Sequence, residues 1–455
     1  MLIRGTFVLS LDPEVGDRAD CDVLIDDGVI AEIGQGLPDA GAEVVDGTRT
    51  IAIPGFVDTH RHTWQTALRG VLPACSLDEY VVARCRFGPL FTPDDVYVAN
   101  LLGSLEALDA GITTMLDWSH ISNTPEHADE AVRGLADSGI RAVYAHGVPA
   151  GTEWGGQSTL AHPDDARRLR ERYFASDDQL LTFAMALRVP GIAAPEVVVD
   201  DWRLARELDA RITAHVGMRM VGRRGAHVSG LAKLGLLGPD VTYVHCNDSS
   251  DDELDLIAAT GGTVSIAPFV EMAMGHGYPP TGRFLERGVR PSLSVDVTTS
   301  GPGDMFSQMR TAFAAERMRA FTDDEHVPFA PTLTPRDMLE FATIEGARAC
   351  GLESKIGSLA PGKDADIVLL RTDLLNVAPV YDPVAAVVLH ADLSNVDTVL
   401  VRGRFRKREG RLVQAGLPSF VARAERSRER ILGAAGPLTD AVAAHTKHDP
   451  VSIAD

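Results

Sequence analysis

Two histidines separated by one residue, His60 and His62, are the first side chains in the chain that could do metal chemistry. They follow an apolar stretch over residues 51–57, interrupted by Pro54-Gly55, which we expect to be a buried strand. Residues i and i+2 of an extended chain point to the same side, so both imidazoles can reach one point in space. Two neutral imidazoles there supply half of a zinc-type site. The alternative is an exposed turn with two solvated histidines.

The strand that carries these histidines begins a long region in which short apolar runs alternate with helical stretches. The helical stretches include residues 92–110, 125–138, 164–175 and 251–260. Strands that alternate with helices form parallel sheets, and eight of them predict a closed (β/α)₈ barrel. The eight expected strands cover residues 51–57, 113–116, 142–145, 181–186, 212–214, 241–244, 263–266 and 292–295.

Polar side chains stand at the carboxyl ends of four of these strands, where a barrel enzyme has its active site. His60 and His62 follow the first strand. His215, His245 and Asp296 follow the fifth, sixth and eighth. Any one of the last three alone could be a structural polar residue. Together the set offers four or five nitrogen and oxygen donors, which suits Zn²⁺, Fe²⁺ or Mn²⁺.

Both ends of the chain are rich in short β-like runs, one of them at residues 385–389. Neither end could bury a sheet face alone, so residues 1–50 and 357–415 are expected to form one small β-sandwich. The barrel would then occupy residues 51–356. Residues 416–455 form a helical tail, whose Arg- and Glu-rich run at residues 423–430 indicates a solvated helix face.

Composition narrows the class of protein. The 455 residues carry a formal net charge of −21, which argues against nucleic acid or an anionic membrane as partner and favours solubility. Five scattered cysteines without a Cys-x-x-Cys motif indicate neither a disulfide framework nor a thiolate zinc site. Without a signal-peptide pattern or a long apolar run, the sequence predicts a cytoplasmic protein. Assembly into a homo-oligomer stays open.

The ordered motifs resemble those of the amidohydrolase superfamily, on the branch with cytosine, guanine and S-adenosylhomocysteine deaminases and the triazine chlorohydrolases. The resemblance covers nearly the whole chain and implies a metal-bearing barrel with a small sandwich built from the termini. It rests on residues 54–62, 68–70, 111–114, His215, 245, 250–254, Asp296, 304–306 and 356–366.

The resemblance also implies roles for the strand-end residues. His60, His62, His215 and Asp296 would hold the metal, and His245 would orient the attacking water, whose proton Asp296 can accept. Binuclear relatives have a carboxylated lysine at the fourth strand, but residues 185–188 contain none. We therefore expect one divalent ion, Zn²⁺ before Fe²⁺ or Mn²⁺.

One position departs from the deaminase pattern. A glutamate normally lies three residues after the histidine of the fifth strand, where it shuttles a proton, but this chain has Met218. Candidate replacements are Glu271 and His276 in the loop after the seventh strand, with Glu271 preferred as the catalytic acid. The alternative for both is a polar residue on a surface loop. An apolar wall of Phe269 and Met272 would raise the pKa of Glu271.

Four further side chains are candidates for contact with the substrate. Trp64 and Gln65 lie beside the His60–His62 motif, and His120 follows the second strand. Arg188, after the fourth strand, would suit a carboxylate or carbonyl group. With His276 they form the expected substrate-binding set, although each could instead be a packing residue.

These residues support a metal-dependent hydrolase that uses a metal-activated water to cleave a C–N bond of a small substrate. It would be a deaminase or a cyclic amide or amidine hydrolase, and a heterocycle is one candidate substrate. One alternative is displacement of a better leaving group such as chloride, or a metal-assisted lyase step, because neither needs the acid that Met218 lacks. A second alternative is a non-catalytic metal-binding homologue, against which an intact His245 and Asp296 argue.

Overall fold

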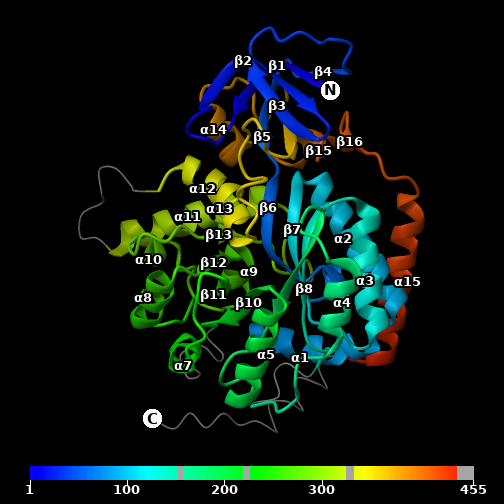
Figure 1. Cartoon of the computed structure of the whole chain (residues 1–455), viewed down its shortest axis with the longest axis vertical. Coiled ribbons are helices and arrows are strands. Elements are labelled where there is room, and N and C mark those ends of the chain that lie inside the picture. The colour runs from blue at the N-terminus through cyan, green and yellow to red at the C-terminus, as the bar shows by residue number, and fades with distance from the viewer. Residues whose placement is uncertain (152–156, 219–225, 324–332, 438–455) are drawn as a thin grey trace.

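The computed structural model contains an eight-stranded parallel barrel and, beyond one end of it, a separate mixed sheet built from both chain ends (Figure 1). The structure describes residues 1–151, 157–218, 226–323 and 333–437. The predicted fold class is confirmed. The barrel strands are β6 (Phe56–Arg61), β7 (Ile112–Ser119), β8 (Arg141–His146), β9 (Leu181–Ala186), β10 (Arg211–Val216), β11 (Val241–His245), β12 (Thr263–Ile266) and β13 (Ser292–Leu293).

The barrel closes between its first and last strands at the residues predicted to do chemistry. The Asp296 amide donates to the His60 carbonyl at 2.8 Å, and the His62 amide donates to the Asp296 carbonyl at 2.8 Å. Asp58 adds a side-chain link, since its Oδ1 accepts a hydrogen bond from the Val295 amide at 3.0 Å. The contact that closes the barrel therefore also fixes three candidate metal ligands.

Helices cover the outside of the barrel, and local signals set their ends (Figure 1). Ser250 caps α8 in a reciprocal capping box with Glu253, and Gly261 ends it at φ 74°, so α8 spans the predicted residues. In the described residues between β6 and the second half of the terminal sheet, the α-helices are α1 (Leu77–Phe87), α2 (Pro93–Asp109), α3 (Pro125–Ser138), α4 (Asp165–Tyr173), α5 (Pro195–Glu207), α7 (His227–Lys233), α8 (Asp251–Thr260), α9 (Pro268–Ala273), α10 (Thr281–Leu285), α11 (Met305–Asp323), α12 (Pro335–Phe341) and α13 (Ile344–Ala349).

The terminal sheet joins the two ends of the chain through the antiparallel pair β5 and β14. Its strand order is β17-β16-β15-β14-β5-β1-β2-β3, with β4 paired to β1. Apolar residues from both chain ends share one core cluster in this sheet. The strands are β1 (Leu2–Leu9), β2 (Asp17–Asp26), β3 (Val29–Gly34), β4 (Val44–Asp46), β5 (Thr50–Pro54), β14 (Ile367–Arg371), β15 (Val396–Val401), β16 (Arg404–Arg408) and β17 (Arg411–Leu412).

The single strand expected over residues 51–57 is wrong, because two strands share that stretch. Strand β5 belongs to the terminal sheet, and β6 begins the barrel. The chain crosses between them at Gly55, where a Cβ atom would lie 2.0 Å from Thr113 Oγ1. Only glycine allows this close approach. Because β6 follows β5 directly, the amino end of β6 lies next to the terminal sheet. The carboxyl ends of the parallel barrel strands therefore lie at the end of the barrel away from that sheet.

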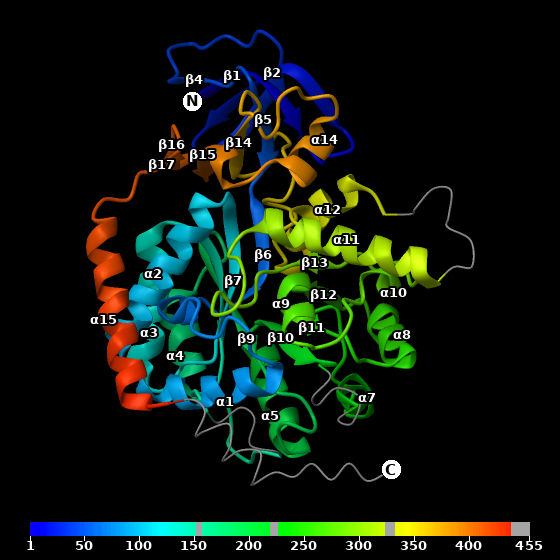
Figure 2. The ribbon, with the colours of Figure 1, turned by 180° about the vertical axis from the view of Figure 1, so that it is seen from behind.

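One other expectation is wrong, the strand at residues 385–389, whereas the helix expected in the tail is confirmed. Residues 385–389 are helical, in α14 (Pro383–Ala385) and the π-helix η3 (Ala386–His390), because Asp382 caps the helix and Pro383 starts it. Helix α15 (Leu417–Ala435) forms as predicted within the tail and packs against α2 (Figure 2). Its charged run also agrees with the predicted solvated face, because Glu425, Arg426, Glu429 and Arg430 are exposed. Residues 438–455 of that predicted tail lie outside the described residues.

The barrel interior is filled by side chains beneath the site. Trp118, Val143, Ala186 and Val244 from four strands pack there with Ala347 of α13. This apolar floor leaves the polar side chains at the carboxyl ends as the chemical face of the barrel. In the parts of the chain that the structure describes, no helix combines the length and apolar character needed to cross a bilayer.

Candidate metal centre

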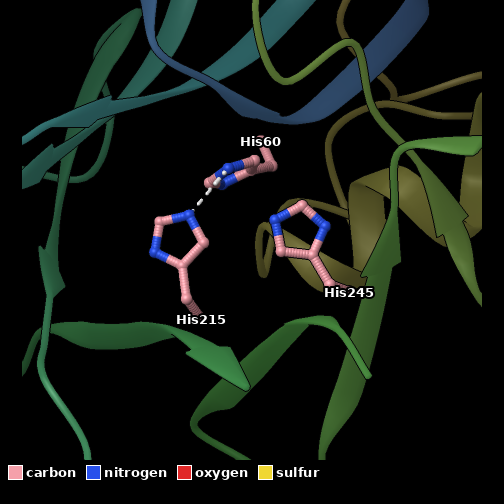
Figure 3. Close-up of side chains that lie close together, drawn as sticks. All are labelled: His60, His215 and His245. Atoms are coloured by element: carbon pink, nitrogen blue, oxygen red, sulfur yellow. Dashed lines mark hydrogen bonds between the residues drawn. The ribbon is translucent and has the colours of Figure 1, made fainter. Parts of the chain in front are cut away.

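Three histidine rings converge above this floor (Figure 3). His60 comes from β6, His215 from β10 and His245 from the end of β11. The Nε2 atoms of His60 and His215 lie 3.2 Å apart. The ring centroids of His60 and His245 lie 5.6 Å apart. The structure thus brings together residues that are up to 185 positions apart in sequence, as the strand-end pattern predicts.

Asp296 completes the cluster with distances that suit a metal ion. Its Oδ1 lies 3.3 Å from His60 Nε2 and 3.4 Å from His62 Nε2. Two donor atoms on one tetrahedral ion, with metal–ligand bonds of about 2.0–2.2 Å, lie roughly 3.3–3.6 Å apart. The donor spacing therefore fits a divalent cation held by imidazole nitrogen and carboxylate oxygen.

The protonation of these groups also suits a metal. Burial lowers the pKa of His60, His62 and His215 below that of a free imidazole, which favours the neutral rings that metals require. The Nδ1–H of His62 donates to the Trp118 carbonyl at 3.1 Å, so Nε2 keeps its lone pair for the centre. Burial alone would raise the pKa of Asp296, but its contact with His60 holds the pKa below the usual carboxyl range.

Backbone conformation at the site departs from ordinary L-residue geometry. His245 has φ 76° and Asp296 has φ 65°, in the left-handed region that side chains other than glycine seldom adopt. The barrel-closing hydrogen bonds hold Asp296 in this conformation. Such outliers are concentrated at functional sites, where the surrounding structure over-determines them.

Two overlapping donor triples are present among the described residues. One contains His60, His215 and His245, and the other contains His60, His62 and Asp296. His245 differs from the other three histidines, because its Nδ1 is engaged by Glu271 at 3.1 Å. Its Nε2 lies 3.8 Å from Asp296 Oδ2. The other carboxylate oxygen, Oδ1, is the one that lies near His60 and His62. His245 thus lies between two carboxylates.

Glu271 is buried behind His245 rather than on a surface loop. Its carboxylate accepts hydrogen bonds from the Ala267 amide at 2.8 Å and from Asn247 Nδ2 at 3.0 Å, besides its contact with His245. The prediction that Phe269 and Met272 form an apolar wall around this carboxylate is wrong, because Met272 is 46% exposed. Burial alone would lower the pKa of His245, but the hydrogen bond to Glu271 raises it above that of a free imidazole.

A narrow pocket opens next to this cluster. Met218, at the position of the missing glutamate, lines it and is buried. His120 lines it too, with its ring centroid 4.1 Å from that of His62. His276 completes this side of the pocket, and neither of its ring nitrogens has a hydrogen-bond partner among the residues described. Burial lowers the pKa of His276 to about 3, so it is a neutral hydrogen-bonding group.

Three of the predicted substrate residues do not line this pocket. Arg188 forms a buried ion pair with Asp201 at 2.9 Å, so its charge is already neutralised and we no longer assign it to the substrate. Gln65 donates to the Tyr80 hydroxyl at 2.7 Å. Trp64 lies behind His120, with Nε1 3.5 Å from its Nδ1. Gln65 and Trp64 therefore support pocket side chains instead of lining the pocket.

One wall of the pocket consists of residues that the sequence motifs do not indicate. Helix α1 (Leu77–Phe87) follows β6 and the 3₁₀ turn η1 (Thr63–Leu68), and it lies at the end of the barrel opposite the terminal sheet (Figures 1 and 2). A capping box of Ser76 and Glu79 marks its start and could have revealed the helix, though not its place. Its pocket-lining residues are Leu77, Tyr80, Val81 and Arg84.

Comparison with solved structures agrees with this architecture. An adenosine deaminase from Xanthomonas campestris with bound zinc is 24% identical, with a TM-score of 0.83 over 94% of this chain and 98% of that one. The atrazine chlorohydrolase of Arthrobacter aurescens, complexed with zinc, is 22% identical, with a TM-score of 0.81 over 94% and 99%. At these identities the likeness shows the fold.

Two sequence relatives, both deaminases, have higher identity to this chain than the solved structures above. A 5′-deoxyadenosine deaminase of Methanothermobacter thermautotrophicus is 31% identical over 424 residues, which cover 89% of this chain and 94% of the relative. A 5-methylthioadenosine/S-adenosylhomocysteine deaminase of Symbiobacterium thermophilum is 29% identical over 89% and 92%. The sequence profile of the amidohydrolase family matches residues 51–406. The predicted resemblance is confirmed: the chain is an amidohydrolase-type enzyme and belongs to the amidohydrolase family.

Proposed function

We propose that this protein is a metal-dependent hydrolase that cleaves a C–N bond of a small heterocyclic substrate, as the deaminases among its relatives are named for doing. The observation that carries the proposal is the donor cluster of imidazoles and Asp296, spaced at 3.2–3.4 Å beside a pocket. Family membership supports the same reaction class.

We assign one divalent ion, zinc, to His60, His62, His215 and Asp296. The predicted set spans both donor triples and leaves His245 outside the ion's coordination. Two features of His245 support this choice: the hydrogen bond to Glu271 raises its pKa, whereas burial lowers the pKa of the three ligand histidines, and its Nε2 faces Asp296 Oδ2 at 3.8 Å. When bound, such an ion lowers the pKa of a water molecule toward neutrality and polarises the bond to be cleaved.

The protein groups then move the protons. Asp296, through Oδ2, accepts the proton of the attacking water and passes it to His245 Nε2, which faces that oxygen at 3.8 Å. His245 gives this proton to the leaving amino group, which departs as ammonia, while the hydroxyl of the water stays on the ring carbon. Glu271, predicted as the acid itself, lies on the far side of His245, so we assign it as a positioning residue that acts through that ring. His120 and His276 bind the heterocycle through their ring nitrogens.

Met218 favours one second candidate, the displacement of chloride from a heterocycle. A thioether cannot protonate a leaving group, and Met218 is buried where the deaminase pattern has glutamate. Chloride leaves without a proton, so this reaction needs only the attacking water and its base. The atrazine chlorohydrolase neighbour shares the fold, which makes the reaction compatible with this architecture.

One screen separates the two candidates. The zinc-loaded protein is incubated with 5′-deoxyadenosine, with a panel of single-ring aminated heterocycles and with their chlorinated counterparts, while ammonia and chloride release are measured. The His60→Ala protein serves as the inactive control. Ammonia release abolished by chelation supports the first proposal, whereas chloride release alone supports the second. Release of neither product from any compound contradicts both.

A further inference from the structure

The pocket wall formed by α1 is not part of the barrel, so strand pairing does not fix its position. Its first turn is tied to the loop after β12, since the Leu77 amide donates to the Met274 carbonyl at 3.0 Å. Tyr80 and Arg84, one turn apart, project from this helix toward the pocket. Any displacement of α1 would therefore change the shape of the substrate site.

The other end of α1 is held by the last residues of the C-terminal helix. Arg86 Nε donates to the Ala435 carbonyl at 2.6 Å, and a second guanidinium nitrogen contacts the same oxygen. Ala435 is the last residue of α15, where carbonyls lack partners within the helix. A cation there also interacts favourably with the helix dipole.

Helix α15 is itself fixed to the barrel, so it can act as a support. Arg430 donates to the Leu90 carbonyl at 3.0 Å, in the 3₁₀ turn η2 (Gly88–Leu90) that continues α1, and it also pairs with Asp95 of α2. The next residue, Ile431, is fully buried and belongs to the main hydrophobic core cluster. Helix α15 therefore contacts both the turn η2, which follows α1, and helix α2.

We propose that α15 braces the pocket wall, with Arg86 as a positioning residue that locks α1 through the carboxyl end of α15. The chain would thereby use residues more than 300 positions away to set the shape of its substrate site. Asn123 also donates to the Gly88 carbonyl at 3.1 Å, so α1 keeps a second tie when the Arg86 contact is lost. Removing that contact should loosen α1 without unfolding the barrel.

Hydrogen exchange on the zinc-loaded full chain tests the brace. In Arg86→Met, amides of residues 77–87 should exchange about tenfold faster, the effect expected for losing a charged hydrogen bond that restrains local opening. Amides of β10 and β11 should be unchanged. The matched control is Arg426→Met, an exposed arginine of α15, which should exchange like the wild type. Unchanged exchange in α1, or equal acceleration throughout the barrel, overturns the proposal.

A kinetic readout rests on the proposed function as well. With 5′-deoxyadenosine, or the heterocycle of the screen that is hydrolysed, Arg86→Met should raise KM several-fold and leave kcat within about twofold, since pocket shape changes and the proton-moving groups do not. A several-fold fall in kcat with an unchanged KM contradicts the brace. A wild-type protein that hydrolyses nothing contradicts the proposed function instead, while the exchange result still decides the brace.

Discussion

Replacing Glu271 by glutamine tests the role of the carboxylate behind His245. The carboxylate receives three hydrogen bonds, two at Oε1 from Ala267 and His245 and one at Oε2 from Asn247. Glutamine keeps the shape and one acceptor oxygen for the first two donors. Its new NH₂ group would face Asn247, whose buried Oδ1 has no hydrogen-bond partner among the described residues and can accept after the amide turns. The substitution therefore removes charge with little change in geometry.

The size of the effect distinguishes two roles for Glu271. A hydrogen bond to a charged group contributes about 1.5–3 kcal/mol and a neutral one about 0.5–1.5 kcal/mol, so the loss is about 1–2 kcal/mol. If all of it is expressed in the transition state, kcat falls roughly 5- to 30-fold. A group that itself donates the proton would cost roughly 10²- to 10⁴-fold.

The assay is steady-state kinetics of Glu271→Gln on the substrate found by the screen, with metal content measured on the same sample. We expect the smaller loss, with metal content unchanged, because Glu271 acts through His245 and does not bind the ion. Asn247→Asp is a useful comparison, since it places a second carboxyl group beside Glu271. Full activity in Glu271→Gln would refute the coupling of Glu271 to His245, and a loss above about 10²-fold would make Glu271 the acid.

Three further predictions follow from the site. His245→Ala and Asp296→Asn should each lower kcat by at least about 10²-fold, as steady-state rates will show, because proton transfer is lost; near-wild-type turnover would refute the scheme. Met218→Glu should raise ammonia release relative to chloride release in the two-product assay, and no change in that ratio would count against the missing-acid argument. Burial lowers the pKa of His146 to about 4, below the unfolded value of about 6.5, so this group's contribution to stability is present above pH 6.5 and is lost as pH falls toward 4. The melting temperature should therefore fall as the pH is lowered from 6.5 to 4, and it should fall less steeply in His146→Gln. Identical slopes of melting temperature against pH in the two proteins would contradict the burial effect.

Much of the barrel and of its donor set could be predicted from sequence because the signals are local. Period-two spacing places His60 and His62 on one side of a strand, and the rule that barrel sites lie at carboxyl ends brings in His215, His245 and Asp296. Capping residues fix helix ends in the same way, as Ser250 and Gly261 do for α8. Each of these inferences needs only a few neighbouring residues and one general rule.

The rest depended on contacts between residues far apart in the chain. Arg188 is at a strand end, but Asp201 neutralises it, and no local pattern shows this. The division of residues 51–57 into two strands follows from the close approach of Gly55 to Thr113. Helix α1 has a clear start signal, yet its place over the pocket depends on Met274 and Ala435. Tertiary contacts decided these features, and sequence periodicity does not report them.

Metal stoichiometry tests the central claim most directly. The full chain is produced with ample zinc, dialysed, and analysed by inductively coupled plasma mass spectrometry against protein concentration, beside His60→Ala as the variant that loses the shared donor of both triples. We predict one divalent ion per chain in the wild type and close to none in His60→Ala, because removing a ligand opens the site. Two ions per chain, none in the wild type, or unchanged metal in His60→Ala would contradict a single ion at this centre.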